Sequence, residues 1–225
     1  IGAELQRFVD LGFGAVKMRV GAMDRRVETS AARVLAAREA LGPDIELMID
    51  AHGTCSLPEA KRLMRLVEGA NLRWFEEPTP LDDHAAAAEL RATTDVPIAV
   101  GESLSTRFDF ADVLRLRAAD VLQPDVALVG GITEAKRVAT LAETAQVELA
   151  PHLWGSAVSY LAGLHVAFAS PASRILEVSL GGNPLLRQLP EVEPPVTDGG
   201  VDAPTEPGLG FRPRQDLLEE WTVPL

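Results

Sequence analysis

The sequence lacks several features, and each absence excludes a class of protein. It has one cysteine in 225 residues, Cys55, which excludes a disulfide framework and predicts a reducing, cytoplasmic setting. No apolar run reaches the ~18 residues of a membrane span, so we expect no transmembrane helix. Lys and Arg total 21 against 33 Asp and Glu, and the resulting charge of −12 makes nucleic acids and anionic membranes unfavourable partners. The phosphate-binding patterns GxxxxGK and GxGxxG are also missing.

What the sequence does contain is an alternation of short apolar runs with longer amphipathic stretches. The apolar runs predict strands over residues 15–20, 45–50, 72–76, 98–101, 121–123, 147–150 and 175–178. The stretches between them predict helices over 27–41, 57–68, 83–93, 108–117, 133–145 and 156–169. Strands that alternate with helices of this length indicate parallel pairing with crossover helices, so we predict an α/β fold.

Nearly every predicted strand ends on a charged or polar residue. In a closed barrel of parallel strands these ends converge on one site, whereas an open sheet spreads them along a line. We therefore predict a (β/α) TIM-type barrel over residues 1–180 and an irregular, Gly- and Pro-rich tail over 181–225 that packs on it. Residues 1–14 read as the end of a helix, so we expect the first barrel strand to be absent from this chain.

Three carboxylates, Asp50, Glu76 and Glu102, stand at the ends of successive strands, 26 residues apart in both cases (76 − 50 and 102 − 76). Gathered at one barrel mouth they would repel one another, so a cation is needed to hold them. Oxygen ligands favour a hard divalent ion, which predicts Mg²⁺, with Mn²⁺ as the alternative. The competing interpretation is that each acid caps the following helix. Glu77 is expected to point away from Glu76 and make a structural contact.

Two cations lie on one predicted strand. Lys17 and Arg19 are two residues apart, so both face the same side, and the carboxylates together with an anionic substrate would be their partners. The alternative is a solvated pair at the end of a strand.

An Asp–His pair follows. Asp125 and His152 end consecutive strands, and an Asp beside a His fixes its tautomer and raises its basicity, which indicates a general base. Glu177 closes the ring on the last predicted strand. We interpret His84 and His165, which fall on helices, as structural.

The ordered motifs VKMRVG, IDAHG, WFEEP, VGES, QPDVALVGG, PHLWGSA and ILEVS resemble the barrel domain of the mandelate racemase branch of the enolase superfamily, in the mandelate racemase/muconate lactonizing enzyme family. The resemblance implies a modified (β/α) barrel and an N-terminal capping domain that this chain does not contain. It also implies a set of roles: Mg²⁺ ligation by Asp50, Glu76 and Glu102, an Asp125–His152 dyad with His152 as the base, and substrate-carboxylate contacts from Glu177 and Lys17.

The chemistry implied is Mg²⁺-dependent abstraction of the proton α to a carboxylate, giving a metal-stabilised enediolate. Two residues depart from the family pattern. Arg19 stands where many members have a second lysine, and because Arg stays protonated it is a poor base, which favours one-base chemistry. His52 replaces a common asparagine and is expected to touch the substrate, act as a further acid or support a neighbouring group.

From these residues we predict dehydration of a sugar acid, an aldonate or aldarate, to a 2-keto-3-deoxy acid. The alternatives are a cycloisomerase or a racemase/epimerase of the same family, or a non-catalytic barrel kept as a scaffold. The expected partners are a small-molecule carboxylate and further copies of the chain, as a dimer or octamer by family analogy.

Overall fold

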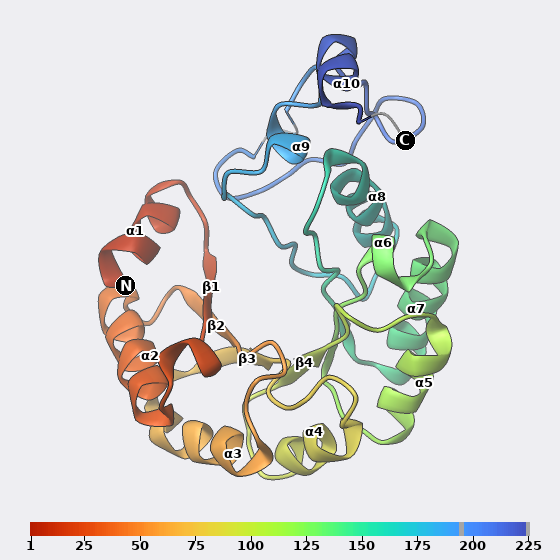
Figure 1. The fold of residues 1–225 in the computed structure, drawn as a ribbon. Helices are drawn as coiled ribbons and strands as arrows, with labels where there is room; N and C mark the ends of the chain where they lie inside the picture. Colours follow the sequence, from red (N-terminus) through yellow and green to blue (C-terminus); the bar gives the residue numbers. More distant parts are fainter. Residues whose placement is uncertain (194–195, 224–225) are drawn as a thin grey trace. The chain divides into compact units, whose positions relative to one another are not determined.

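The computed structural model describes residues 1–193 and 196–223, and the chain divides into two compact units (Figure 1). The first unit comprises Ile1–Gly101, Phe110–Leu122 and Thr197–Gly200. The second comprises Glu102–Asp109, Gln123–Val196 and Val201–Leu225.

Parallel strands with helices on one face make up the first unit. The strands pair in chain order: β1 (Ala15–Arg19), β2 (Glu46–Asp50), β3 (Leu72–Glu76), β4 (Ile98–Val100) and β5 (Val121–Leu122). The helices are α1 (Gly2–Asp10), η1 (Ala22–Asp24), α2 (Val27–Leu41), α3 (Leu57–Leu66), η2 (Glu68–Ala70), α4 (His84–Arg91) and α5 (Arg107–Arg115), whose first three residues belong to the second unit. In Figure 1, α2, α3 and α4 follow one another along one face of the strands.

The register of the strands aligns polar residues at their carboxyl ends. Arg19 lies opposite Asp50, and Asp50 lies opposite Glu76. Within β1, Val16 and Met18 are buried, whereas Lys17 and Arg19 are more exposed. Lys17 and Arg19 therefore share a face, as expected from the two-residue repeat of a strand.

Large apolar side chains fix the strands of the first unit. Leu47, Ile49, Phe75 and Phe110 are all fully buried. Burial of each such side chain contributes about 1.5–3 kcal/mol, which is why these short strands hold a common register.

A segment late in the sequence also packs into the first unit. Gly12 has φ +91°, and a Cβ there would lie 2.6 Å from the carbonyl carbon of Asp198. Residues Thr197–Gly200 therefore sit directly on the turn between α1 and β1, and only glycine fits at position 12.

The second unit contains α6 (Val126–Val129), α7 (Ile132–Ala145), β6 (Glu148–Leu149), α8 (Ala157–Phe168), α9 (Pro184–Arg187) and α10 (Gln215–Trp221). Parallel bridges join Asp125 to His152 and Leu149 to Ser173. Its apolar core lies around α8, where Val201, Leu209 and Phe211 from the C-terminal segment pack against the buried cluster.

One expectation about local structure was wrong, and one element was not anticipated. Among the described residues, 175–178 form no strand; Leu149 instead pairs with Ser173, and its N–H donates to the Ala172 carbonyl at 3.0 Å. Because β6 is only two residues long, little ladder remains for a longer partner. The short helix α6, which begins directly after Asp125, was not predicted.

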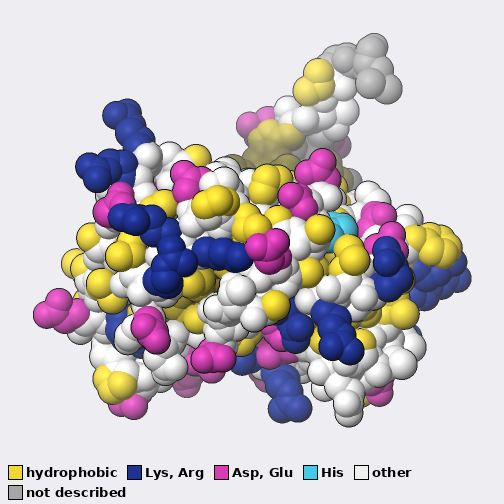
Figure 2. All heavy atoms as spheres, turned by 90° about the horizontal axis from the view of Figure 1, so that it is seen from below, with side chains coloured by type: hydrophobic (Ala, Val, Ile, Leu, Met, Phe, Trp, Pro, Cys, Tyr) yellow, Lys and Arg dark blue, Asp and Glu magenta, His cyan; other side chains and the backbone are white. Residues whose placement is uncertain are grey.

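No helix among the described residues is long and apolar enough to cross a membrane. Figure 2 shows one face of the molecule, on which acidic and basic side chains are interspersed among apolar ones.

Candidate metal and proton-transfer site

The first unit contains two neighbouring buried carboxylates, Asp50 and Glu76, and a lysine that forms an ion pair with Glu76. Glu76 is completely buried, and the Lys17 ammonium donates to both of its carboxylate oxygens, at 2.7 and 2.8 Å. The indole N–H of Trp74 donates to Glu76 Oε2 at 3.2 Å. Asp50, 4% exposed, stands beside Glu76 on the adjacent strand. Lys17, Asp50 and Glu76 are thus brought together as predicted.

The electrostatics of Asp50 bear on whether this pair suits a metal ion. Burial, and after it the neighbouring Glu76 carboxylate, raise the pKa of Asp50 to about 6 against the opposing effect of Lys17 and Arg19. Lys17 and Arg19 together do not offset burial and the repulsion between the two carboxylates, since the pKa of Asp50 stays raised. A divalent cation would favour their ionised forms, so the donor set fits Mg²⁺ or Mn²⁺.

Arg19 contacts Asp50 from the exposed end of β1. Its Nε lies 3.3 Å from Asp50 Oδ2, and its side chain is 48% exposed. This guanidinium is therefore neither a wholly solvated charge nor a buried one. The short distance to Asp50 is consistent with an ion pair between the two side chains. That Arg19 is a poor base stays a prediction.

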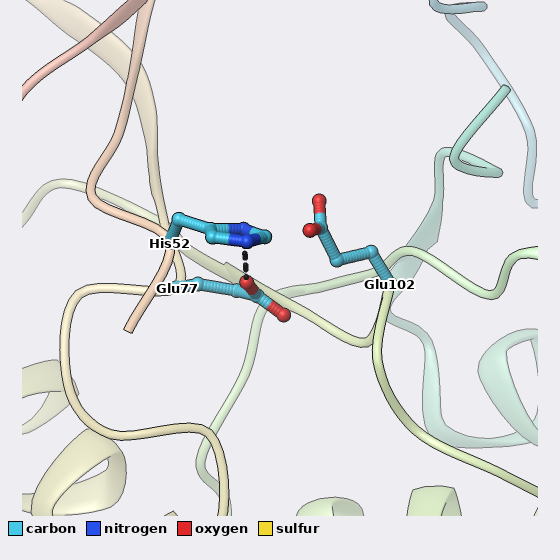
Figure 3. A group of neighbouring side chains, drawn as sticks. All are labelled: His52, Glu77 and Glu102. Atoms are coloured by element: carbon cyan, nitrogen blue, oxygen red, sulfur yellow. Dashed lines mark ion pairs between the residues drawn. The ribbon is translucent and has the colours of Figure 1, made fainter. Parts of the chain in front are cut away.

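His52 and Glu77 form a carboxylate–imidazole contact in the first unit. His52 Nδ1 lies 3.4 Å from Glu77 Oε2, and Glu77 is 4% exposed (Figure 3, which also draws Glu102 of the second unit). Both residues have positive φ, +48° and +39°, and the Gly53 N–H donates to the Glu77 carbonyl at 2.8 Å. Glu77 thus turns to a different partner from Glu76, and strained backbone of this kind concentrates at functional sites.

In the second unit the predicted Asp–His pair is present. His152 Nδ1 lies 2.8 Å from Asp125 Oδ2, and the other oxygen of Asp125 accepts the Ala127 N–H at 2.7 Å. That second bond caps α6 and fixes the carboxylate. With Asp125 ionised, Nδ1 carries the proton it donates, so Nε2 presents its lone pair.

Two further carboxylates lie near the free nitrogen of this ring. Glu102 Oε2 is 3.5 Å and Glu177 Oε2 is 4.0 Å from His152 Nε2. Burial lowers the pKa of His152, but the Asp125 hydrogen bond and the charges of Glu177 and Glu102 outweigh it, so the pKa lies above its ordinary value. Such a ring is a stronger base than a free imidazole.

Three further side chains with reactive groups are Cys55, His84 and His165. Burial, with the charges of Glu59 and Asp24, raises the pKa of the Cys55 thiol to about 11, which keeps it neutral and unreactive. His84 begins α4 and His165 lies on α8, as predicted.

One cluster was missed by sequence reasoning. Glu134 on α7 is only 8% exposed and accepts hydrogen bonds from Arg107 and Arg137. A glutamate near a helix start reads as an ordinary solvated residue, and nothing in the 27-residue spacing between Arg107 and Glu134 indicates the contact.

The first unit thus carries an acid cluster at its strand ends, and the second carries an Asp–His dyad. The chain belongs to the enolase C-terminal domain-like family, whose model matches residues 1–217. The family and the barrel-domain fold predicted from the motifs are thereby confirmed.

Curated relatives and solved structures extend this match. The chain is 34% identical over 221 residues to a D-galactarolactone cycloisomerase of Agrobacterium fabrum, covering 95% of this chain and 58% of the relative. It is 32% identical over 214 residues to an arabinonate dehydratase of Saccharolobus solfataricus, covering 95% and 57%. An L-talarate dehydratase from Polaromonas, solved with Mg and L-glucarate, superposes with a TM-score of 0.86 at 34% identity, covering 99% of this chain and 59% of that one.

The chain therefore spans a little under three fifths of the length of these proteins. The relatives are named as sugar acid dehydratases and as a cycloisomerase of a sugar lactone, which supports an enzyme of this superfamily.

Proposed function

We propose that the protein abstracts the proton α to the carboxylate of a sugar acid, with a divalent metal bound, and eliminates the β-hydroxyl to give a 2-keto-3-deoxy acid. The observation that carries the proposal is the His152–Asp125 pair, with Nδ1 2.8 Å from a carboxylate that is itself fixed by the Ala127 N–H. The dehydratase relatives support the same reaction.

Asp50, Glu76 and Glu102 are the proposed ligands of Mg²⁺. When bound, the ion neutralises the negative charge that builds on the substrate carboxylate as the α-proton leaves. The support is the raised pKa of Asp50, about 6, beside a fully buried Glu76.

His152 Nε2 takes the α-proton. Asp125 holds the ring in the tautomer with Nδ1–H and stabilises the imidazolium that forms. The leaving β-hydroxyl must gain a proton, which returns from His152 Nε2 or comes from His52, whose Nδ1 lies against Glu77. Loss of water leaves an enol, which tautomerises to the keto acid.

Lys17 and Glu177 orient the substrate carboxylate. The Lys17 ammonium contacts Glu76 and its side chain is 19% exposed, so it supplies a fixed positive charge rather than a mobile one. Glu177, 4.0 Å from His152 Nε2, would take up a proton to hydrogen-bond an oxygen of the substrate carboxylate.

The second candidate is an isomerase that uses the same α-proton abstraction without loss of water. The match to a D-galactarolactone cycloisomerase favours it, because that relative is as similar to the chain as the dehydratases are. An epimerase would need a base on each face of the substrate, and Arg19 is a poor one.

The test is proton NMR in D₂O with Mg²⁺, with aldonates, aldarates and their lactones supplied one at a time. A new 3-deoxy methylene signal together with loss of one substrate supports the dehydratase. Deuterium at the α-carbon, or conversion of a lactone without loss of water, makes it an isomerase. No change with any compound refutes the sugar-acid reaction and favours a scaffold.

The His152→Asn variant tests the base, and His84→Asn, at the start of α4, is its matched control. We expect loss of turnover of about 10²–10⁴-fold for the first and none for the second, since a positioned general base contributes that much. Equal turnover in both variants would refute the assignment of His152.

A further inference from the structure

An ionic cluster around the buried carboxylate of Glu134 anchors the loop that follows β4. The Glu134 carboxylate accepts the backbone N–H of Arg107 at 3.0 Å. The Arg107 guanidinium reaches both of its oxygens, at 2.7 and 2.8 Å, and Arg137 adds a contact at 2.7 Å. A bidentate, charge-assisted contact of this kind fixes orientation as well as distance.

The anchored loop also carries a residue of the site. Glu102 stands five positions before Arg107, and the Thr106 N–H between them donates to the Val129 carbonyl at the end of α6, at 3.3 Å. Helix α6 begins at Asp125, which holds the His152 ring. The second unit thus contains a closed path from Glu102 through the loop, α6 and Asp125 to His152, and back across 3.5 Å to Glu102.

From this path we propose that Glu134 is a positioning residue, which clamps Arg107 and so keeps the Glu102 carboxylate beside the His152 imidazole. The inference rests on the proposed role of Glu102 as a metal ligand. Glu134 acts through its contacts with Arg107 and through the loop. Only four residues lie between Glu102 and Arg107, so movement of one carries the other.

The test compares Glu134→Gln with Glu143→Gln, an exposed glutamate on the same helix that loses the same charge. Isothermal titration measures the affinity for Mg²⁺, which depends on the position of the Glu102 carboxylate. Hydrogen exchange in the metal-free protein measures how well the backbone amides of residues 102–107 are protected. For Glu134→Gln we expect Mg²⁺ binding to weaken about 10–100-fold, the usual effect of losing a group that orients a ligand. We also expect faster exchange confined to residues 102–107. Glu143→Gln should match the parent protein in both.

The pattern of exchange separates positioning from general loosening. If Glu134 only stabilises the unit, exchange rises throughout it, α8 included, and the proposal is overturned. Unchanged exchange at the Arg107 amide, which donates directly to Glu134, overturns it as well. Arg107→Lys, which keeps the charge but cannot bridge both oxygens, provides a second variant if Glu134→Gln does not fold.

Failure of the metal assignment gives a different result. If the parent protein binds no Mg²⁺, or Glu102→Gln binds it equally well, the proposed ligand role falls. Hydrogen exchange alone then tests the positioning role of Glu134. Lost protection at residues 102–107 in Glu134→Gln supports that role, and full protection there refutes it.

Discussion

Two lysine–glutamate pairs in the first unit have the same length and very different burial. The Lys17–Glu76 and Lys61–Glu89 pairs are each 2.7 Å long. Glu76 has no exposed side-chain surface, whereas the Glu89 side chain is 61% exposed. Replacing each lysine with methionine keeps the apolar stem and removes the charge, so the comparison isolates the effect of burial.

Removing Lys17 leaves Glu76 as an uncompensated buried charge beside Asp50, which costs about 3–5 kcal/mol. Removing Lys61 breaks a solvated pair worth about 0–1 kcal/mol. With a urea m-value of about 2 kcal/mol/M, Lys17→Met should lower the unfolding midpoint by about 1.5–2.5 M and Lys61→Met by less than ~0.5 M.

The assay is urea unfolding of the metal-free protein at pH 7. A double-mutant cycle with Glu76→Gln, which keeps an acceptor for the Trp74 N–H, measures the coupling between the two charges. A coupling energy for Lys17 and Glu76 no larger than that for the surface pair would refute the view that burial sets the strength of these contacts.

Three other predictions follow from burial and from the stated pKa values. Phe110→Ala should destabilise the protein by about 3–5 kcal/mol because Phe110 is fully buried. Phe108→Ala, two positions earlier and 65% exposed, should cost under ~1 kcal/mol in the same urea assay, and equal losses would contradict this. The Arg107 N–H and the Arg137 guanidinium hold the pKa of Glu134 near 2, below its usual 4.5, so its contribution is present above pH 4.5 and lost toward pH 2. The stability difference between the parent protein and Glu134→Gln should therefore shrink over that interval in acid-unfolding curves; a constant difference would count against it. Cys55, buried and with a pKa of about 11, should react with a thiol reagent at pH 8 far more slowly than in urea. Equal rates would disprove its burial.

The sequence was most informative where apolar runs are long. The strand predicted over 72–76 matches β3 at both ends, and the helix predicted over 27–41 matches α2. Strand-end acids could be found because each one interrupts an apolar run. The short run at 175–178 carried too little pattern to separate a strand from extended chain, and it forms no strand in the part of the chain described here.

Side-chain pairings between distant segments could not be read from the sequence. Glu134 and Arg107 lie on separate helices, and each is a charged residue of the kind found on any exposed helix surface. His52 and Glu77 were noted singly, but their contact depends on left-handed backbone at both, which non-glycine residues seldom adopt and sequence patterns do not reveal.

The contact of Asp198 with Gly12 has a consequence for synthesis on the ribosome. The first unit includes Thr197–Gly200, although its longest segment ends at Gly101. The unit is therefore incomplete until residue 200 has been synthesised. At about 5–20 residues per second, the intervening 99 residues (200 − 101) take roughly 5–20 s. During that interval the α1–β1 turn lacks the contact that Asp198 later makes with Gly12. The Lys17–Glu76 contact, formed from earlier residues, can already exist in the nascent chain while the unit around it is still incomplete.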